Sequence, residues 1–286
     1  MVRRNSGRRR RRLAALATAV VTGAGVAFAY VVTGGTVTWP SEAAAPHTAA
    51  GTQSSPPSTT TTPPPPPPVL PFNAKLTSQD IPVKGGGVRS GACSGSLIAP
   101  QWVITAGHCF HDINDVRVGG PPQYTMSVVI GKLKDSDPGG HAAQVVDVRQ
   151  SPLNDLAVVK LDKAVKDVVP LQMATTPPAM GQPLQFAGWG SLSATVLGPS
   201  DHLKRGQFTV SGIGEYTLEA QPVGVRTVEN GPCPEDSGGP FFISDDDRTG
   251  MLVAIVNTGP PCPQPGAEII ARVDVVAGWI QQQIVA

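Results

Sequence analysis

The sequence GPCPEDSGGP, residues 231–240, sets Ser237 between two acidic residues and two glycines. Glycine and proline make such a stretch a tight turn, and most turns of this composition are plain surface loops. A serine held on a tight turn can also act as a nucleophile, provided that a base lies beside it. Ser237 is therefore a candidate nucleophile, and the fold must bring a base to it.

The candidate base is His108, in the sequence TAGHC at residues 105–109. It follows the strand-like run 102–104, and a bend of small residues after a strand can present an imidazole into a cleft. Taken alone, a histidine beside a cysteine is more often structural, and His111, three residues later, would permit a metal pair. A third residue is needed to choose between these interpretations.

That third residue is Asp155, in the sequence NDLAVV at residues 154–159. A carboxylate at the head of an apolar strand is costly unless a charged or hydrogen-bonding group meets it. An imidazole would serve, whereas the alternative is that Asn154 and Asp155 only form the turn before the strand. His108, Asp155 and Ser237 together supply a base, a group that orients the base, and a nucleophile.

The fold class follows from the texture of residues 71–286, where short apolar runs alternate with Gly, Pro, Asn and Asp. Many short strands separated by turns favour an all-β fold of antiparallel barrels or sandwiches. The predicted strands are 96–99, 102–105, 127–130, 145–149, 156–161, 184–187, 207–210, 241–243, 252–256 and 269–273. A closing helix is predicted after Asp274, as its N-cap, with one apolar stripe. The stripe consists of Val275, Val276, Trp279, Ile280 and Ile284.

The chain has four cysteines, which permit three disulfide pairings. They are Cys93, Cys109, Cys233 and Cys262. The simplest pairing joins neighbours in the sequence and would fasten two stretches that carry candidate catalytic residues, but sequence arithmetic alone does not choose it. A zinc site is disfavoured because no Cys-x-x-Cys pair exists, and we expect no metal.

The amino-terminal part has the order of an export signal. Seven of the 22 basic residues are arginines within residues 1–12, and an uncharged run of 25 residues, 13–37, follows them. This run suits a cleaved signal peptide, and it also exceeds the roughly 20 residues that span a bilayer, so a retained anchor stays open. Residues 1–12 then stay in the cytoplasm. Residues 38–70 are rich in Pro and Thr and predict an extended linker.

Four short strings resemble those of the chymotrypsin/trypsin-like serine proteases. The resemblance extends from about residue 70 to the end and suggests an exported, bacterial-type member of that family. The strings are CSGSLIAPQWVITAGHC at 93–109, NDLA at 154–157, GWG at 188–190 and DSGGP at 236–240. The resemblance implies two antiparallel six-stranded β-barrels with a C-terminal helix and an active site between them. It also implies that the four cysteines pair as Cys93 with Cys109 and Cys233 with Cys262.

The resemblance further implies a role for each of the three candidate residues. Ser237 attacks the scissile carbonyl, His108 takes its proton and returns it to the leaving amine, and Asp155 holds the imidazole in the required tautomer. The oxyanion hole would consist of the backbone N–H groups of Ser237 and Glu235. The family ordinarily has glycine where this chain has Glu235, so we expect an active but tempered enzyme.

The substrate-binding residues also depart from the family pattern. Gly231 stands where trypsin-like specificity for Arg and Lys uses an aspartate, which predicts a small or apolar primary side chain. Counting along the chain leaves either Glu268 or Gly266 on the pocket wall. Asn257, Thr258 and Gly259 match the segment that pairs with the substrate strand.

The sequence offers no clear route to activation. No Arg-Ile-Val-Gly-Gly-type junction precedes the domain. The group that neutralises Asp236 is left open as either a new amino terminus or an internal basic residue.

These observations predict a serine endopeptidase that acts on proteins or peptides, without a cofactor, as an extracytoplasmic monomer that is secreted or membrane-anchored. Outside residues 1–12 the chain carries 15 basic against 21 acidic side chains, which argues against nucleic acid as a partner. The alternative is a catalytically impaired, protease-like module that binds a partner at the cell surface.

Overall fold

The computed structural model describes residues 69–285, and the predicted basic segment, the export segment and nearly all of the linker lie outside this range. Leu70, at the end of the predicted linker, is fully buried and donates its backbone N–H to the carbonyl of Asp247 at 2.6 Å. The folded domain therefore includes Leu70. Within residues 69–285, no helix is both long and apolar enough to cross a bilayer.

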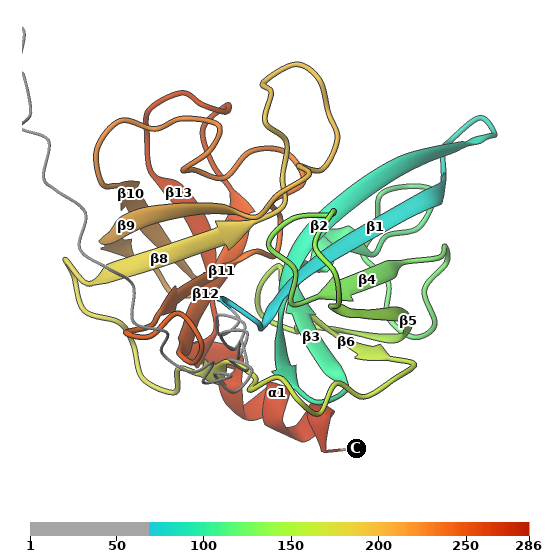
Figure 1. Ribbon diagram of the computed structural model, residues 1–286, viewed down its shortest axis with the longest axis horizontal. Coiled ribbons are helices and arrows are strands. Elements are labelled where there is room, and N and C mark those ends of the chain that lie inside the picture. Colours follow the sequence, from blue (N-terminus) through green and yellow to red (C-terminus); the bar gives the residue numbers. More distant parts are fainter. Residues whose placement is uncertain (1–68, 286) are drawn as a thin grey trace, which may run out of the picture. The chain divides into compact units, whose positions relative to one another are not determined.

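The first barrel is a closed, six-stranded antiparallel sheet with the order β1-β2-β3-β6-β5-β4 (Figure 1). Its strands are β1 (Asn73–Pro82), β2 (Val88–Ala99), β3 (Trp102–Thr105), β4 (Ser127–Ile130), β5 (His141–Gln150) and β6 (Ala157–Leu161). Pairing of β1 with β4 closes the barrel.

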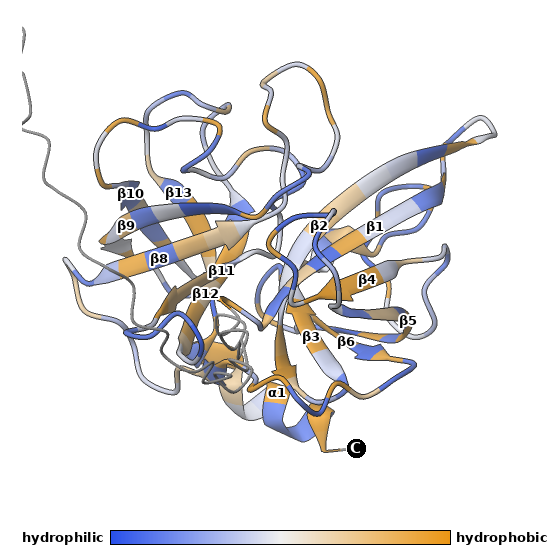
Figure 2. Ribbon diagram, viewed as in Figure 1, coloured by the Kyte–Doolittle hydropathy of each residue, from blue (hydrophilic) through white to orange (hydrophobic). Residues whose placement is uncertain are grey.

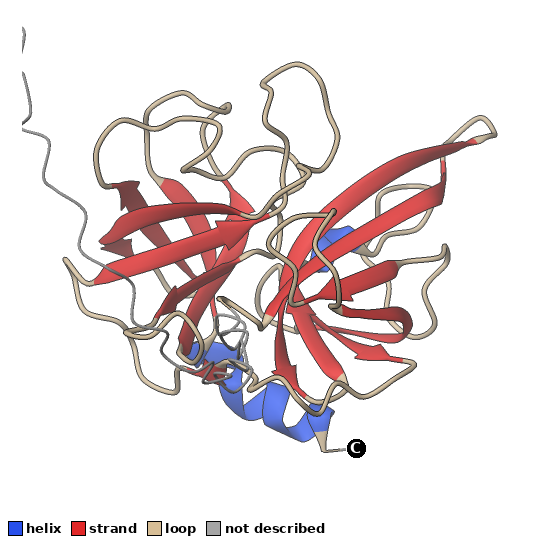
Figure 3. Cartoon of the chain, in the orientation of Figure 1, coloured by secondary structure: helices blue, strands red, loops and turns tan. Residues whose placement is uncertain are grey.

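The second barrel has the order β11-β8-β9-β10-β13-β12, and pairing of β11 with β12 closes it. Figure 3 shows the domain as mostly strands and loops, with a helix next to the carboxyl end. The strands of the second barrel are β8 (Pro183–Gly188), β9 (Lys204–Ile213), β10 (Thr217–Pro222), β11 (Pro240–Ile243), β12 (Met251–Thr258) and β13 (Glu268–Arg272). A two-residue strand, β7 (Gln172–Met173), adds to β12 in parallel. The structure thus confirms the prediction of two six-stranded antiparallel barrels.

Alternation of apolar and polar residues explains most of the strands. In β10 the side chains of Leu218 and Ala220 are buried, whereas Glu219 and Gln221 between them are exposed. This period of two is typical of a strand with one buried face. Figure 2 shows the same pattern in both barrels, with apolar residues along the strands and hydrophilic residues on many of the loops.

Aromatic rings fill the second barrel. Phe186, Phe208 and Phe241 pack together with ring centroids 5.0–6.1 Å apart. Trp189 is also buried, and its indole N–H donates to the side-chain oxygen of Asn73 on β1 at 2.9 Å. Because Trp189 follows β8, this bond ties the second barrel to the first.

The chain closes with a 3-10 turn (Asp274–Val276) and the helix α1 (Ala277–Ile284). Val276 and Ile280 are buried, and the other predicted members of the stripe pack against the same core while partly exposed. The prediction that Asp274 caps the helix is wrong. The N-cap positions of the turn and the helix are Val273 and Val276, and the Asp274 carboxylate instead accepts two hydrogen bonds from the Arg272 guanidinium at 3.0 and 2.6 Å.

Candidate active site

The imidazole of His108 stands on a 3-10 turn (Gly107–Cys109) directly after β3. Its side chain is 44% exposed, so it can meet a substrate. Gly107 is required at this turn because a Cβ there would lie 2.7 Å from Asp155 Oδ1 and 2.6 Å from Gln150 Oε1. The small residues that the sequence offered as a bend therefore allow His108 to approach Asp155.

Asp155 holds His108 by two hydrogen bonds. Its Oδ2 lies 2.6 Å from His108 Nδ1, and its Oδ1 accepts the backbone N–H of His108 at 2.8 Å. Burial alone would raise the pKa of Asp155, but the hydrogen bonds and charge of His108, with the charge of Arg117, bring that pKa below its ordinary value. Asp155 is thus held as a carboxylate that accepts the Nδ1 proton.

Two neighbours position Asp155, and of these the sequence did not reveal Arg117. Arg117 Nη1 lies 3.3 Å from Asp155 Oδ1 and 2.9 Å from the carbonyl of Asn154. The Asn154 side chain donates to the carbonyl of Arg272 at 2.8 Å, which is on the second barrel. Asn154 therefore does more than form a turn, because it joins the Asp155 loop to the opposite barrel.

The nucleophile loop is held against the first barrel by Ser94 on β2. The Ser94 backbone N–H donates to the carbonyl of Ser237 at 2.9 Å, and its hydroxyl lies 3.3 Å from the carbonyl of Glu235. Gly238 has a φ of 83°, and a Cβ there would come within 2.5 Å of the Ala106 nitrogen and the Ser94 carbonyl. Only glycine fits this contact between the barrels, which explains the glycine after the serine.

His108 and Ser237 line the same cavity of about 230 Å³, together with Glu235 and the Cys93–Cys109 disulfide. The structure therefore brings the three candidate catalytic residues into one place. His111 lines this cavity too, but its Nδ1 lies 2.8 Å from the carbonyl of Asp112. No group of three or more potential metal ligands occurs among residues 69–285.

Glu235 adopts a backbone conformation that favours glycine. Its φ is 75°, in the left-handed region, which costs a residue with a side chain roughly 1–2 kcal/mol. Within the described part of the chain, the backbone N–H groups of Glu235 and Ser237 donate to no protein acceptor. The turn therefore forms despite the side chain, and it leaves two N–H groups free to meet an oxyanion.

The side chain of Glu235 places an acidic group in the cavity of His108 and Ser237. Its Oε2 atom is buried without a hydrogen-bond partner among the described residues. Burial first, and then the charge of Asp236, raises the pKa of Glu235 above its ordinary value. A carboxylate that lines the cavity of His108 and Ser237 opposes the build-up of negative charge there.

A second cavity, of about 250 Å³, opens beside Ser237 and is lined by Asn257, Thr258 and Gly259. Of the two residues that counting along the chain left open, Glu268 lines this cavity and Gly266 does not. The Glu268 carboxylate lies so close to Gly259 that a Cβ there would overlap it. The sequence-predicted wall of the pocket therefore carries a buried acid.

That acid is paired with Arg226, which sequence reasoning missed. Arg226 Nη2 lies 2.5 Å from Glu268 Oε1, and both side chains are 2% exposed. Arg226 also lies against Gly231, since a Cβ on Gly231 would be 2.8 Å from its Nε atom. Gly231 is accordingly covered by Arg226 and does not itself line the cavity.

Burial of Glu268 makes stability depend on pH. Burial raises the pKa of Glu268 to about 7 from an ordinary 4.5, although the charge of Arg226 opposes the rise. The folded protein thus binds this proton more tightly than the unfolded chain, so stability falls as pH rises from about 4.5 through 7. We expect Glu268→Gln to lack this pH dependence. The melting temperature of wild type minus that of Glu268→Gln should therefore fall between pH 5 and pH 8. Parallel melting curves at every pH would contradict this expectation.

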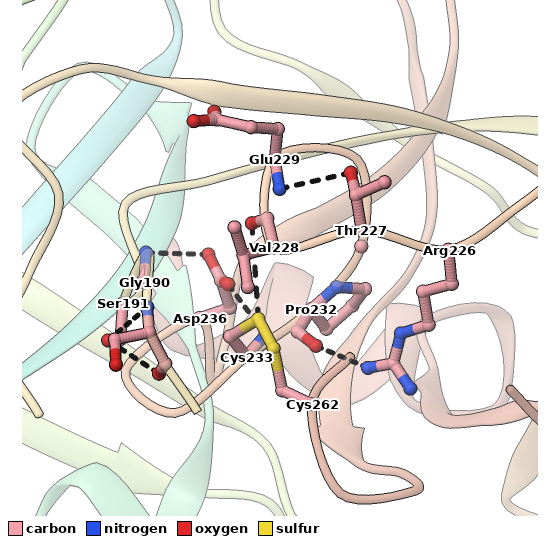
Figure 4. Close-up of a disulfide and its surroundings, with 12 residues drawn as sticks. Gly190, Ser191, Arg226, Thr227, Val228, Glu229, Pro232, Cys233, Asp236 and Cys262 are labelled. Carbon is pink, nitrogen blue, oxygen red and sulfur yellow. Dashed lines mark hydrogen bonds between the residues drawn. A yellow bond between two sulfur atoms is a disulfide. The ribbon is translucent and has the colours of Figure 1, made fainter. Parts of the chain in front are cut away.

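The second disulfide, Cys233–Cys262, lies between Asp236 and Arg226 (Figure 4). In Figure 4 the carboxylate of Asp236 accepts the Gly190 N–H on one side of the disulfide, and Arg226 donates to the Pro232 carbonyl on the other. Both disulfides have the pairing that the resemblance implies. The Cys233–Cys262 bond fixes the nucleophile loop to the wall of the pocket.

Two closed barrels with a histidine, an aspartate and a serine at their junction define a class of hydrolase, and comparisons identify the family. A model of the trypsin family matches residues 69–280. Human serine protease 1 is 29% identical over 212 residues, which cover 68% of this chain and 80% of that protein. Mouse kallikrein 1-related peptidase b16 is 30% identical over 200 residues, covering 62% of this chain and 74% of that protein.

A solved structure shows the same fold. Neuropsin, a serine protease expressed in the limbic system of mouse brain, is 22% identical, with a TM-score of 0.57, and the match covers 75% of this chain and 95% of that one. The chain belongs to the trypsin family of serine proteases and is a serine endopeptidase, which acts on protein or peptide substrates. The relatives named here are animal proteins, so the comparisons do not support the bacterial-type assignment.

Proposed function

We propose that His108, Asp155 and Ser237 hydrolyse peptide bonds through an acyl-enzyme. The observation that carries this proposal is the 2.6 Å contact between Asp155 and His108 Nδ1 in the cavity that Ser237 also lines. With its Nδ1 proton donated to Asp155, the neutral imidazole has a free lone pair on Nε2. This nitrogen takes the Ser237 hydroxyl proton as the oxygen attacks the substrate carbonyl, and then gives it to the leaving amine.

The backbone N–H groups of Glu235 and Ser237 stabilise the tetrahedral intermediate. Each is free of protein acceptors among residues 69–285, and donors aimed at a developing oxyanion are worth about 10²–10³ in turnover. Deacylation repeats the steps with water as the nucleophile and His108 again as the base. The reaction as written needs no metal or cofactor.

We also propose that the enzyme prefers small or apolar side chains on the acyl side of the scissile bond. Arg226 pairs with Glu268, and burial raises the pKa of Glu268 to about 7, so this acid offers little attraction to an arginine or lysine of the substrate. The pair also fills the base of the cavity beside Ser237, since both residues line it and Glu268 lies across Gly259. A long side chain would have to displace a buried ion pair, which is costly.

Profiling a peptide library tests this specificity. Wild type is expected to select small or apolar residues. Glu268→Ala leaves the Arg226 guanidinium unpaired at the base of an enlarged pocket, so its preference is expected to move toward Asp and Glu, by tenfold or more in kcat/KM. A strong preference of wild type for Arg or Lys would overturn the proposal.

We further propose that the enzyme works outside the cytoplasm as a monomer, either secreted or held by the segment 13–37. The two disulfides of the domain suit an oxidising compartment. The choice between secretion and anchoring rests on the sequence alone, because this segment lies outside the described residues. Membership of a family of active proteases does not favour the alternative of a binding module.

Labelling with a fluorophosphonate probe tests the proposed chemistry. The probe phosphorylates a serine only when that serine is activated, so wild type is expected to become labelled and Ser237→Ala to remain unlabelled. Ser94→Ala is no substitute as a control, because Ser94 holds the nucleophile loop. Ser244 directly follows β11, at the end of the strand away from Ser237. Ser244→Ala is therefore a suitable control and should label like wild type. Labelling that survives in Ser237→Ala would refute the assignment.

A further inference from the structure

Lys204, the first residue of β9, forms a completely buried ion pair with Asp236, the residue before the nucleophile. Both side chains are 0% exposed. Full burial raises the pKa of Asp236, and the charge of Lys204 opposes that rise. A carboxylate buried without a cation beside Ser237 would be strongly destabilising, so Lys204 stabilises this loop directly.

Every hydrogen of the Lys204 ammonium has an acceptor. An ammonium has three N–H donors. Besides Asp236, the Nζ atom lies 3.2 Å from the carbonyl of Gly231 and 3.4 Å from the carbonyl of Ser191. Lys204 therefore joins the start of the nucleophile loop, its centre and the loop after β8.

Asp236 is clamped from the other side as well. Its Oδ1 accepts the Gly190 N–H at 2.7 Å and its Oδ2 accepts the Cys233 N–H at 2.8 Å (Figure 4). The Ser191 N–H donates to the carbonyl of Pro234 at 2.8 Å, and a Cβ on Gly190 would overlap the Asp236 carboxylate. These contacts fix residues 234–237, which supply the two oxyanion N–H groups.

The sequence contains no arginine or lysine between Arg12 and Lys75, so nothing there offers a cleavage junction behind either residue. The cation that a new amino terminus would bring to Asp236 is already present as Lys204. We propose that Lys204 is a positioning residue that holds the nucleophile loop in its reactive form in the intact chain, so that catalysis needs no cleavage upstream of the domain. This inference rests on the proposed function of Ser237.

Wild-type protein tests the inference without any substitution. The full chain is incubated with a fluorophosphonate probe, and the intact mass of each labelled species gives its amino terminus. We expect every species that retains residues upstream of residue 69 to be labelled at the same rate, whichever residue is its amino terminus. Labelling confined to one species with a single new amino terminus close to the domain would overturn the inference. If no species is labelled at all, the proposed function fails and the inference fails with it.

Variants of the full chain then test Lys204 itself. Lys204→Met is expected to lower the labelling rate and kcat at least tenfold. Its matched control is Lys160→Met, which removes a half-buried lysine of β6 that lies over the Trp102 ring. That control is expected to label within twofold of wild type. Lys204→Met that labels as fast as wild type would overturn the inference.

A double variant guards against simple misfolding. Lys204→Met with Asp236→Asn leaves no uncompensated charge in the buried site, so it is expected to fold where Lys204→Met is unstable. It is also expected to label faster than Lys204→Met, because the unpaired carboxylate is what displaces the loop. A double variant that is folded, as judged by circular dichroism, yet labels no faster than the single variant would contradict the role of the ion pair.

Discussion

Replacing Asp155 with asparagine is expected to lower kcat about 10⁴-fold while changing KM little. The Asp155 carboxylate accepts both the Nδ1 proton and the backbone N–H of His108, at 2.6 and 2.8 Å. An asparagine can keep one of these bonds by its carbonyl, but its NH₂ group then faces Nδ1. That favours the tautomer with the proton on Nε2, which cannot accept the proton of Ser237.

The measurement is the steady-state hydrolysis of a peptide ester and a peptide amide. Asp162→Asn is the matched control, because Asp162 also accepts a backbone N–H on the first barrel, from Gln144 at 2.8 Å, without contacting His108. The control should retain full activity. A kcat for Asp155→Asn within tenfold of wild type would show that Asp155 does not orient the base.

Replacing Glu235 with glycine is expected to raise kcat by roughly tenfold. The turn that presents the Glu235 N–H already exists, with its φ of 75°, so the gain does not come from building a missing donor. It comes from removing a half-buried carboxylate, one oxygen of which has no hydrogen-bond partner among the described residues, from the cavity that Ser237 also lines. A unit charge several ångströms away contributes on the order of 2 kcal/mol before screening, at an effective dielectric constant near 20.

Glu235→Gln separates charge from shape. It removes the charge and keeps the length of the side chain, so most of the gain in kcat should already appear in it. Glycine should add a stability gain of about 1 kcal/mol, because it adopts a positive φ without strain. If peptide hydrolysis by Glu235→Gly equals that of wild type, the idea of a tempered enzyme must be abandoned.

The sequence predicted strands well where apolar residues dominate and poorly where they do not. The limits of β3 and β4 were predicted to the residue, since their sequences WVIT and SVVI are short and apolar between clear turns. β1 was missed because its sequence, NAKLTSQDIP, is largely polar. Its Lys75 is 8% exposed, and only the tertiary structure, with Asp135 and the Trp189 ring, makes a lysine acceptable there.

The same distinction holds for the candidate site. His108, Asp155 and Ser237 could be predicted because each lies in a short string whose order along the chain is informative. Lys204 could not, because it is 32 residues from Asp236 and looks like any lysine at the start of a strand. Arg226 was missed for a similar reason, since only the folded chain brings it against Gly231 and Glu268.

Glu235 lies between these cases. The sequence revealed the departure from glycine but could not tell whether the turn would survive it. In the structure the residue takes the left-handed conformation, and its N–H has no protein acceptor in the described part of the chain, which supports the proposed oxyanion hole. The effect of the Glu235 side chain on kcat is then expected to come from its charge.

Trapping the covalent intermediate tests the central claim most directly. Wild type is mixed with a slowly hydrolysed p-nitrophenyl ester, quenched in acid during turnover, and examined by intact and tandem mass spectrometry. One acyl group per chain is expected, on Ser237, and it should be absent from Ser237→Ala. An acyl group on any other residue, or turnover without a trapped acyl-enzyme, would contradict the assignment of Ser237 as the nucleophile.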